Sequence, residues 1–383
     1  MEGTRRQTID YGLQREHKDA LTTFCYEGKD PNLREKPYCF PCLYYDHKTV
    51  VSELKRCSRC HVAWYCSAEC QTRHFKDHRA ICKQIAEDEK CLELAAIPLR
   101  HFVDPEEDNA VAENILETRA GELGDIAEAQ DYFKARIILA NSYWTEAYMS
   151  EVKEVWEKSL FHFLELLRLY HISCPLEICF RVPFLLLYLN RDDEAYTFIR
   201  YWIELDNIDD EETLLRHKRS REGDWIYPVE PNCRYRDMFE DYTKLDGQEE
   251  TEPYLMALAI NKMRIVASND FLSRALDYTL HETDGRRIQQ VRSVVQEMLI
   301  GNDNDVASQR QQRDRLLDKI DFYDSKTLGI FLTCEPVSEA RQFMNVDDVF
   351  RGEYDYPLGI ALANGFRSFF RIPGAVDLVR QRV

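Results

Sequence analysis

The 383-residue sequence lacks the features that mark a membrane-bound or secreted protein. Its longest uninterrupted apolar run, from Val182 to Leu189, is far too short to span a bilayer. The first ten residues carry charges, but no apolar stretch follows them, so we expect no secretory signal. These absences predict a soluble, intracellular protein, either cytoplasmic or nuclear, without a membrane partner.

The sequence also lacks an excess of positive charge. Fifty Lys and Arg residues stand against 68 Asp and Glu residues, which leaves a formal net charge of −18. A DNA-binding protein relies on a basic surface that neutralises phosphates, so nucleic acid is not an expected partner. The hydrophobic fraction of 44% is still large enough to build a core, which argues against wholesale disorder.

Familiar catalytic motifs are absent as well. The chain contains no phosphate-binding glycine loop, no HExxH zinc helix and no nucleophile elbow. We therefore assign no catalytic residues and no organic cofactor, and we expect that the protein is not an enzyme.

What the sequence does contain is a cluster of cysteines near its N-terminus. Eight of its 13 cysteines lie between Cys25 and Cys82. In a reducing compartment, such a cluster is expected to bind metal rather than to form disulfides. Most of its members form closely spaced pairs: Cys39 with Cys42, Cys57 with Cys60, Cys66 with Cys70, and His78 with Cys82.

These pairs have the spacing that a tetrahedral Zn²⁺ ion requires. A CxxC turn places two thiolates on one ion, and ligands four positions apart lie one helical turn from each other. Seven cysteines and one histidine supply the ligands of two closed, structural sites, because a catalytic zinc keeps one position open for water. The spacing leaves open whether the pairs combine sequentially or interleave. His74 is a possible alternative ligand, although we expect a solvated or supporting role for it.

Residues 37–83 resemble a MYND-type zinc finger. The resemblance rests on CFPC (39–42), CSRC (57–60), the YC-x3-CQ element (65–71) and His78-x3-Cys82. It implies interleaved sites, in which one zinc is held by Cys39, Cys42, Cys66 and Cys70 and the other by Cys57, Cys60, His78 and Cys82. The chain departs from the family in a longer gap between Cys42 and Cys57, which predicts a protruding loop at 43–56. It also has Phe75 where the family usually has Trp.

The resemblance implies that the finger binds proteins. MYND-type fingers take short proline-rich peptides in a shallow groove beside the second zinc, and Ser58, Gln71 and Phe75 match the groove positions. Phe75 offers an aromatic face to a proline ring but lacks the indole N–H of Trp, so we expect weaker or differently selective binding. The alternative is that Phe75 packs into the core of the finger itself.

The finger differs in charge from the rest of the chain. Residues 34–83 carry ten Lys and Arg residues against five Asp and Glu residues, a formal +5, so the remainder of the chain carries −23. Seven thiolates and two Zn²⁺ ions reduce the finger to about +2, so its basic residues mostly offset the metal sites. The acidic remainder predicts neutral or basic protein partners.

Downstream of the finger, the sequence predicts an acidic linker at 84–128 and a helical domain at 129–383, with residues 1–36 forming an N-terminal segment. Residues 104–128 hold nine acidic residues and one basic residue, Arg119, which is typical of a solvated linker. Apolar residues then recur at three- and four-residue steps, which predicts helices at 129–148, 151–170, 176–190, 192–205, 285–301 and 307–321. An insertion is expected near 207–252, and the pattern assigns no structure to 326–383.

Part of the helical domain weakly resembles tetratricopeptide-type repeats. Residues 184–202 have the pattern of a helical hairpin, with Asn190 at the turn and Ala195 at the small packing position. The pair Leu160-x2-Phe163 recurs as Ala195-x2-Phe198, close to the repeat length of about 34 residues. Residues 254–268 and 271–280 would form a third, degenerate hairpin. An irregular helical domain is the alternative.

A methyltransferase is the competing function, because MYND-type fingers also occur within SET-type lysine methyltransferases. Such enzymes need a glycine-rich segment before the finger and an Asn-His-Ser-Cys segment behind it. The 38 residues before Cys39 contain only scattered glycines, and the nearest later match is His171-Ile-Ser-Cys174. We expect Cys174 and Cys179 to be buried in the helical core. The sequence as a whole therefore predicts a zinc-binding interaction scaffold or adaptor.

Overall fold

The computed structural model describes the finger and most of the helical region. The described residues are 32–105, 110–171, 174–204, 229–237, 239, 252–281, 306–321, 328–329, 332, 364–365 and 367–382. Residues 1–31 of the predicted N-terminal segment, most of the insertion at 207–252 and the predicted helix at 285–301 lie outside these ranges. So does most of the stretch from 326 to 363.

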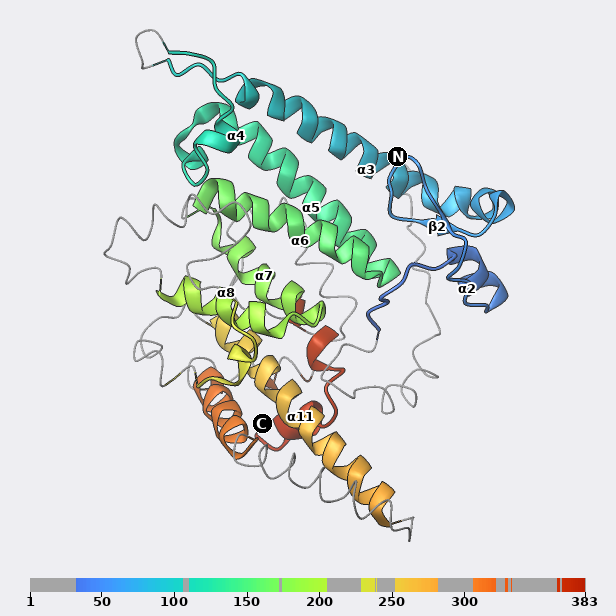
Figure 1. Ribbon diagram of the computed structural model, residues 1–383, viewed down its shortest axis with the longest axis vertical. Coiled ribbons are helices and arrows are strands. Elements are labelled where there is room, and N and C mark those ends of the chain that lie inside the picture. The colour runs from blue at the N-terminus through green and yellow to red at the C-terminus, as the bar shows by residue number, and fades with distance from the viewer. Residues whose placement is uncertain are drawn as a thin grey trace, which may run out of the picture.

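The described helices are stacked in sequence order, from α3 at one end of the molecule to α11 at the other (Figure 1). Four of them lie close to the predicted positions: α5 (Gln130–Ser150), α6 (Lys153–Tyr170), α7 (Leu176–Tyr188) and α8 (Asp192–Glu204). Residues 306–321 are also helical, as predicted. The expectation of a zinc finger followed by a mainly helical region is confirmed.

Tight turns let these helices fold back on each other. Glu151 ends α5 with a φ of 57°, and Asn190 separates α7 from α8 with a φ of 59°. Asparagine tolerates this left-handed conformation better than most residues, which fits its predicted place at the turn. Ala195 and Phe198, on α8, are fully buried.

Residues 252–281 differ from the expectation of a third hairpin. They form one continuous helix, α11 (Glu252–His281), without a turn between 268 and 271. No Gly or Pro interrupts this segment after Pro253, so nothing in its sequence stops the helix. The resemblance of α7 and α8 to a tetratricopeptide-type hairpin stays a prediction.

Helix α3 (Ala68–Arg100) joins the finger to the helical region. Ser67 caps its N-terminus by accepting a hydrogen bond from the Cys70 amide at 3.2 Å. Its 33 residues extend about 50 Å at 1.5 Å per residue, and its later turns pack against α5. There the Asp88 carboxylate accepts a hydrogen bond of 2.6 Å from Ser142. The predicted boundary at residue 83 therefore falls inside a continuous helix.

The described part of the acidic segment is folded against the helices. It contains α4 (Ile115–Thr118) and two short 3-10 turns, Leu123–Asp125 and Ala127–Ala129. The Ile115 and Leu123 side chains are fully buried. Arg119, the one basic residue of the segment, forms ion pairs with Asp104 at 2.7 Å and with Glu113 at 2.6 Å. The apolar residues and this ion-pair cluster keep the segment packed, where the charge pattern predicted a solvated linker.

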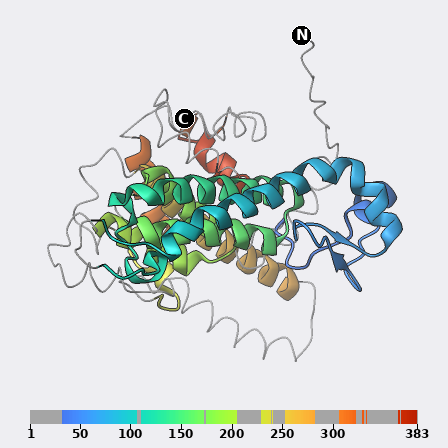
Figure 2. The same cartoon turned by 90° about the horizontal axis from the view of Figure 1, so that it is seen from above.

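The finger itself is built from α2 (Phe40–Asp46), a two-stranded antiparallel sheet of β1 (Lys55–Arg56) and β2 (Trp64–Tyr65), and the first turns of α3. These elements lie together at one end of α3 (Figure 2). None of the helices in the described ranges is long and apolar enough to cross a membrane.

The finger is also docked directly onto the turn between α5 and α6. The backbone of Arg34 donates to Glu151 at 2.8 Å and accepts from Lys153 at 3.0 Å. Tyr38 donates a buried hydrogen bond to the Ser150 carbonyl at 3.1 Å. Buried residues of the finger and of the helices form one continuous cluster, so the finger is not an independently hinged unit.

The C-terminal segment returns to the same turn. The Arg367 guanidinium lies 3.4 Å from the centre of the Tyr148 ring, donates to the Tyr148 carbonyl at 2.9 Å, and bonds the Glu151 carboxylate. Tyr188 on α7 donates to the other oxygen of that carboxylate. Glu151 therefore connects the turn after α5, helix α7 and the end of the chain.

Candidate metal centres and peptide surface

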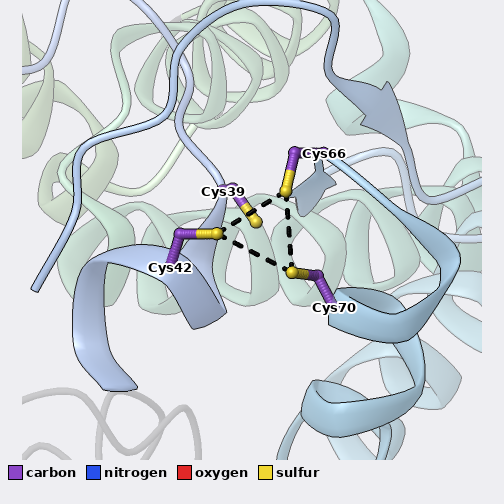
Figure 3. A group of neighbouring side chains, drawn as sticks. All are labelled: Cys39, Cys42, Cys66 and Cys70. Atoms are coloured by element: carbon purple, nitrogen blue, oxygen red, sulfur yellow. Dashed lines mark hydrogen bonds between the residues drawn. The ribbon is translucent and has the colours of Figure 1, made fainter. Parts of the chain in front are cut away.

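The first candidate metal centre consists of four cysteines from three elements. Cys39 and Cys42 lie at the start of α2, Cys66 follows β2, and Cys70 is in the first turn of α3. Their sulfur atoms point toward a common centre (Figure 3). The Cys42 sulfur lies 3.5 Å from that of Cys66 and 3.7 Å from that of Cys70.

The second candidate metal centre consists of Cys57, Cys60, His78 and Cys82, all of them buried. The first two come from the turn after β1, and the last two lie one turn apart on α3. The sulfur atoms of Cys57 and Cys82 are 3.8 Å apart, and the Cys60 sulfur is 3.3 Å from His78 Nε2. The two groups are the interleaved tetrads that the family resemblance implied.

The spacing of the sulfur atoms fits zinc. A tetrahedron with Zn–S bonds of about 2.3 Å has edges of about 3.8 Å between its ligand atoms. The observed sulfur separations of 3.5, 3.6, 3.7 and 3.8 Å match these edges. They are far longer than the roughly 2.05 Å of a disulfide bond. The two tetrads are thus consistent with two structural zinc ions, since all four positions of each site are taken by protein ligands.

The electrostatics of the second tetrad also favour a cation. Cys60 is completely buried, and this burial raises the pKa of its thiol far above the ordinary value. The nearby Cys57 and Cys82 raise it further, because three thiolates at this distance repel each other. A Zn²⁺ ion removes this penalty by binding the thiolates directly.

His74 belongs to neither tetrad, although it lies between Cys70 and His78 on α3. Its side chain is buried, and its Nδ1 atom lies 3.1 Å from the Tyr65 hydroxyl. Its ring stacks on Phe40 at 4.1 Å and on His78 at 5.4 Å. Burial, followed by the charge of His78, lowers the pKa of His74 to about 4, so the ring is neutral at physiological pH.

Of the two roles expected for His74, the structure therefore shows the supporting one: its ring is buried and packs against His78, a residue of the second tetrad, rather than being solvated. The sequence carried a partial signal, because His74 shares a helical face with Cys70 and His78. Its contacts with Phe40 and Tyr65 depend on how α2 and β2 fold over α3, which the local spacing does not specify.

Ser58, Gln71 and Phe75, the predicted peptide-binding residues, are all exposed. Phe75 is 58% exposed, so the alternative that it packs in the finger core is wrong. Gln71 and Phe75 are one turn apart on α3, on the side of the helix that carries His78 and Cys82. Ser58 lies between Cys57 and Cys60. Ser58 and Phe75 are therefore close in sequence to residues of the second tetrad, whereas Gln71 directly follows Cys70 of the first.

Cys174 and Cys179, the two cysteines expected to lie in the helical core, are buried, as predicted. Cys174 is 5% exposed and Cys179 is fully buried. Burial raises the pKa of both thiols, so both are protonated and unreactive at neutral pH. His171, the first residue of the His-Ile-Ser-Cys segment, ends α6, and its Nε2 atom is 2.6 Å from the Tyr201 hydroxyl.

Comparison with known families identifies the N-terminal domain. Residues 38–82 match the family described as "MYND finger", so this part of the chain is a MYND zinc finger. "SET domain-containing protein 14" of Caenorhabditis elegans is 46% identical over 67 residues, which cover 18% of this chain and 14% of that protein. "Histone-lysine N-methyltransferase ASHR1" of Arabidopsis thaliana is 46% identical over 87 residues, which cover 20% of this chain and 18% of that protein.

These similarities do not extend to the rest of the molecule. Both are confined to the finger region, and each spans less than a fifth of the relative's own length. No solved structure matches the chain significantly. The relatives described here therefore inform on the finger alone.

Proposed function

We propose that the protein is an interaction scaffold whose MYND finger binds short proline-rich peptides and whose helical region binds a second protein. The exposed aromatic ring of Phe75 beside the second tetrad is the observation that carries this proposal. An exposed aromatic face suits a proline ring, and Gln71, one turn away, supplies amide donors and an acceptor for the peptide backbone.

The architecture supports a binding role for the finger. Both tetrads are complete without water, so each metal contributes to folding rather than to chemistry. A segment of about 45 residues cannot bury enough surface to fold alone, and zinc binding supplies the missing stabilisation. The contacts with α5 and α6 then fix the peptide surface relative to the helical region.

Titration of the full-length, zinc-loaded protein with a set of proline-rich peptides tests the finger. We expect Phe75→Ala and Gln71→Ala each to weaken binding at least fivefold, and Phe75→Trp to strengthen it by restoring the indole N–H. Thr72→Ala is the matched control, because Thr72 is exposed on the same helix and, among the described residues, its hydroxyl bonds the Ala68 carbonyl alone. Absence of any binding that depends on Phe75 and Gln71 would contradict the proposal.

A second protein partner is proposed for the helical region. Residues outside 34–83 carry a formal charge of −23, which favours a neutral or basic partner. Pull-down with the full chain and with the Phe75→Ala variant separates the two surfaces. Partners retained by the variant bind outside the peptide surface, and loss of every partner would leave the finger as the one binding site.

A lysine methyltransferase-like enzyme is the second candidate, and the names of the two relatives favour it. We propose that this chain is not an enzyme of this kind, because the similarity is limited to the finger. Calorimetric titration with S-adenosylmethionine tests this directly. Saturable binding with micromolar affinity would overturn the proposal and support the enzyme.

A further inference from the structure

Two exposed arginines are close neighbours of residues in the proposed peptide surface. Arg59 directly follows Ser58 in the turn of the second tetrad, and Arg79 lies one helical turn after Phe75 on α3. Both residues are exposed. Within the described part of the chain, neither arginine forms an ion pair or a side-chain hydrogen bond.

Other arginines of the finger are neutralised by nearby carboxylates. Arg73 forms an ion pair with Asp46 at 2.9 Å, and Arg56 forms one with Glu154 of α6 at 2.7 Å. Asp77, which shares the first half of α3 with Arg79, accepts a hydrogen bond from Tyr45 at 2.7 Å. The charges of Arg59 and Arg79 are therefore left available to a ligand at the peptide surface.

The negative charge of the second metal centre is too small to neutralise both arginines. Its three thiolates and one Zn²⁺ ion sum to −1, whereas the two guanidinium groups sum to +2. The exposed Lys76 and Asp77, which directly follow Phe75, cancel each other, so these groups together leave a net positive charge of about one unit. A partner that carries a carboxylate at this position gains an attraction that a neutral or basic partner lacks.

We propose that the finger selects proline-rich segments in which acidic residues flank the prolines. This inference rests on the proposed peptide-binding function and adds the charge of the preferred partner. The Arg59 and Arg79 guanidinium groups pair with Asp or Glu side chains on the two sides of the residue that contacts Phe75. Nucleic acid is the less suitable anion, because two cations are few for a phosphate backbone and the remainder of the chain carries −23.

The test compares three peptides with the same proline-rich core and with acidic, amide or basic flanks. Binding to the zinc-loaded full chain is followed by fluorescence polarisation at 50 mM and 500 mM salt. We expect the acidic peptide to bind about 2- to 30-fold more tightly than the amide peptide at low salt, since each of the two exposed ion pairs contributes about 0.2–1 kcal/mol. The difference should shrink at high salt, where the Debye length is about 4 Å.

Charge-removing variants assign the effect to the two arginines. The double variant Arg59→Gln/Arg79→Gln should bind acidic and amide peptides equally. Lys48→Gln removes one charge from an exposed position after α2, beside the first tetrad, and should keep the preference. Zinc content and circular dichroism establish that each variant is folded.

The outcomes separate this inference from the function on which it rests. Equal affinity of the wild-type protein for all three peptides overturns the charge preference and leaves peptide binding intact. Failure of every peptide to bind overturns both. Steeply salt-dependent binding of a DNA duplex that is lost in the double variant would show that these arginines serve nucleic acid instead.

Discussion

Glu146 offers a quantitative test of how the finger is joined to the helical region. It lies on α5, close enough to Tyr38, Tyr44 and Tyr65 of the finger to raise the pKa values of all three hydroxyl groups. Burial raises the pKa of Glu146 itself from 4.5 to about 8. We predict that Glu146→Gln stabilises the protein at neutral and alkaline pH, because the amide keeps the shape of the side chain without a charge.

The sign and size of the effect follow from the shift. A group whose pKa is raised on folding favours the folded state below its unfolded pKa, and this advantage is lost as the pH rises through the folded pKa. With a pKa shift from 4.5 to about 8, the unfolded chain ionises Glu146 more easily than the folded protein does. At pH 7 this lowers the free energy of unfolding by at most about 3 kcal/mol. The side chain is half-buried and solvent screens part of its charge, so we expect a gain of about 1–2 kcal/mol for the variant.

Urea unfolding of both proteins at pH 6, 7.5 and 9, with zinc in constant excess, measures this difference. The stability gap between Glu146→Gln and wild type should widen as the pH rises and level off above pH 8. Glu157→Gln is the control, because Glu157 is exposed on α6. A gap that stays constant from pH 6 to pH 9 would refute the reasoning, since it would mean that Glu146 is ionised throughout.

Three further predictions concern the metal centres and the C-terminal segment. Cys82→Ser should lower the zinc content from two ions to about one and increase amide hydrogen exchange along α3 beyond the finger, because the helix continues into the bundle. His74→Ala should weaken zinc binding about 10-fold in competition with a chelator, with the zinc stoichiometry at saturation unchanged, because the ring stacks on the ligand His78. Arg367→Ala should cost about 2 kcal/mol in urea unfolding by removing the Arg367–Glu151 ion pair, although Tyr188 and Arg371 still contact the Glu151 carboxylate. Arg380→Ala, at an exposed position, should change the free energy of unfolding by less than about 0.5 kcal/mol.

The sequence was most informative where the structure depends on local spacing. The pairs from Cys39 to Cys82 identified the eight residues of the two tetrads, and apolar periodicity located α5 to α8 within a few residues. Both signals are local, since they depend on neighbours separated by two to four positions. The interleaved pairing of the tetrads came from the family resemblance, because it requires β2 and α3 to fold back onto α2.

Features that depend on tertiary packing were not predicted. The acidic segment looked solvated because its charges outnumber its apolar residues, yet Ile115 and Leu123 are buried in the core. The continuity of α3 beyond residue 83 was missed because the finger motif ends there, while the helix does not. Glu146 gave no signal in sequence, since its burial results from the docking of the finger against α5.

The long helix α3 fixes the distance between the finger and the far end of the helical region that it contacts. A flexible tether between two binding modules lets them sample many separations, and this lowers the benefit of binding both partners at once. Here Phe75 near one end of α3 and Leu99 near the other belong to the same rigid element, about 36 Å apart at 1.5 Å per residue. Two partners held by the finger and by the helical region would therefore meet at one fixed distance and orientation, set by the number of helical turns between them.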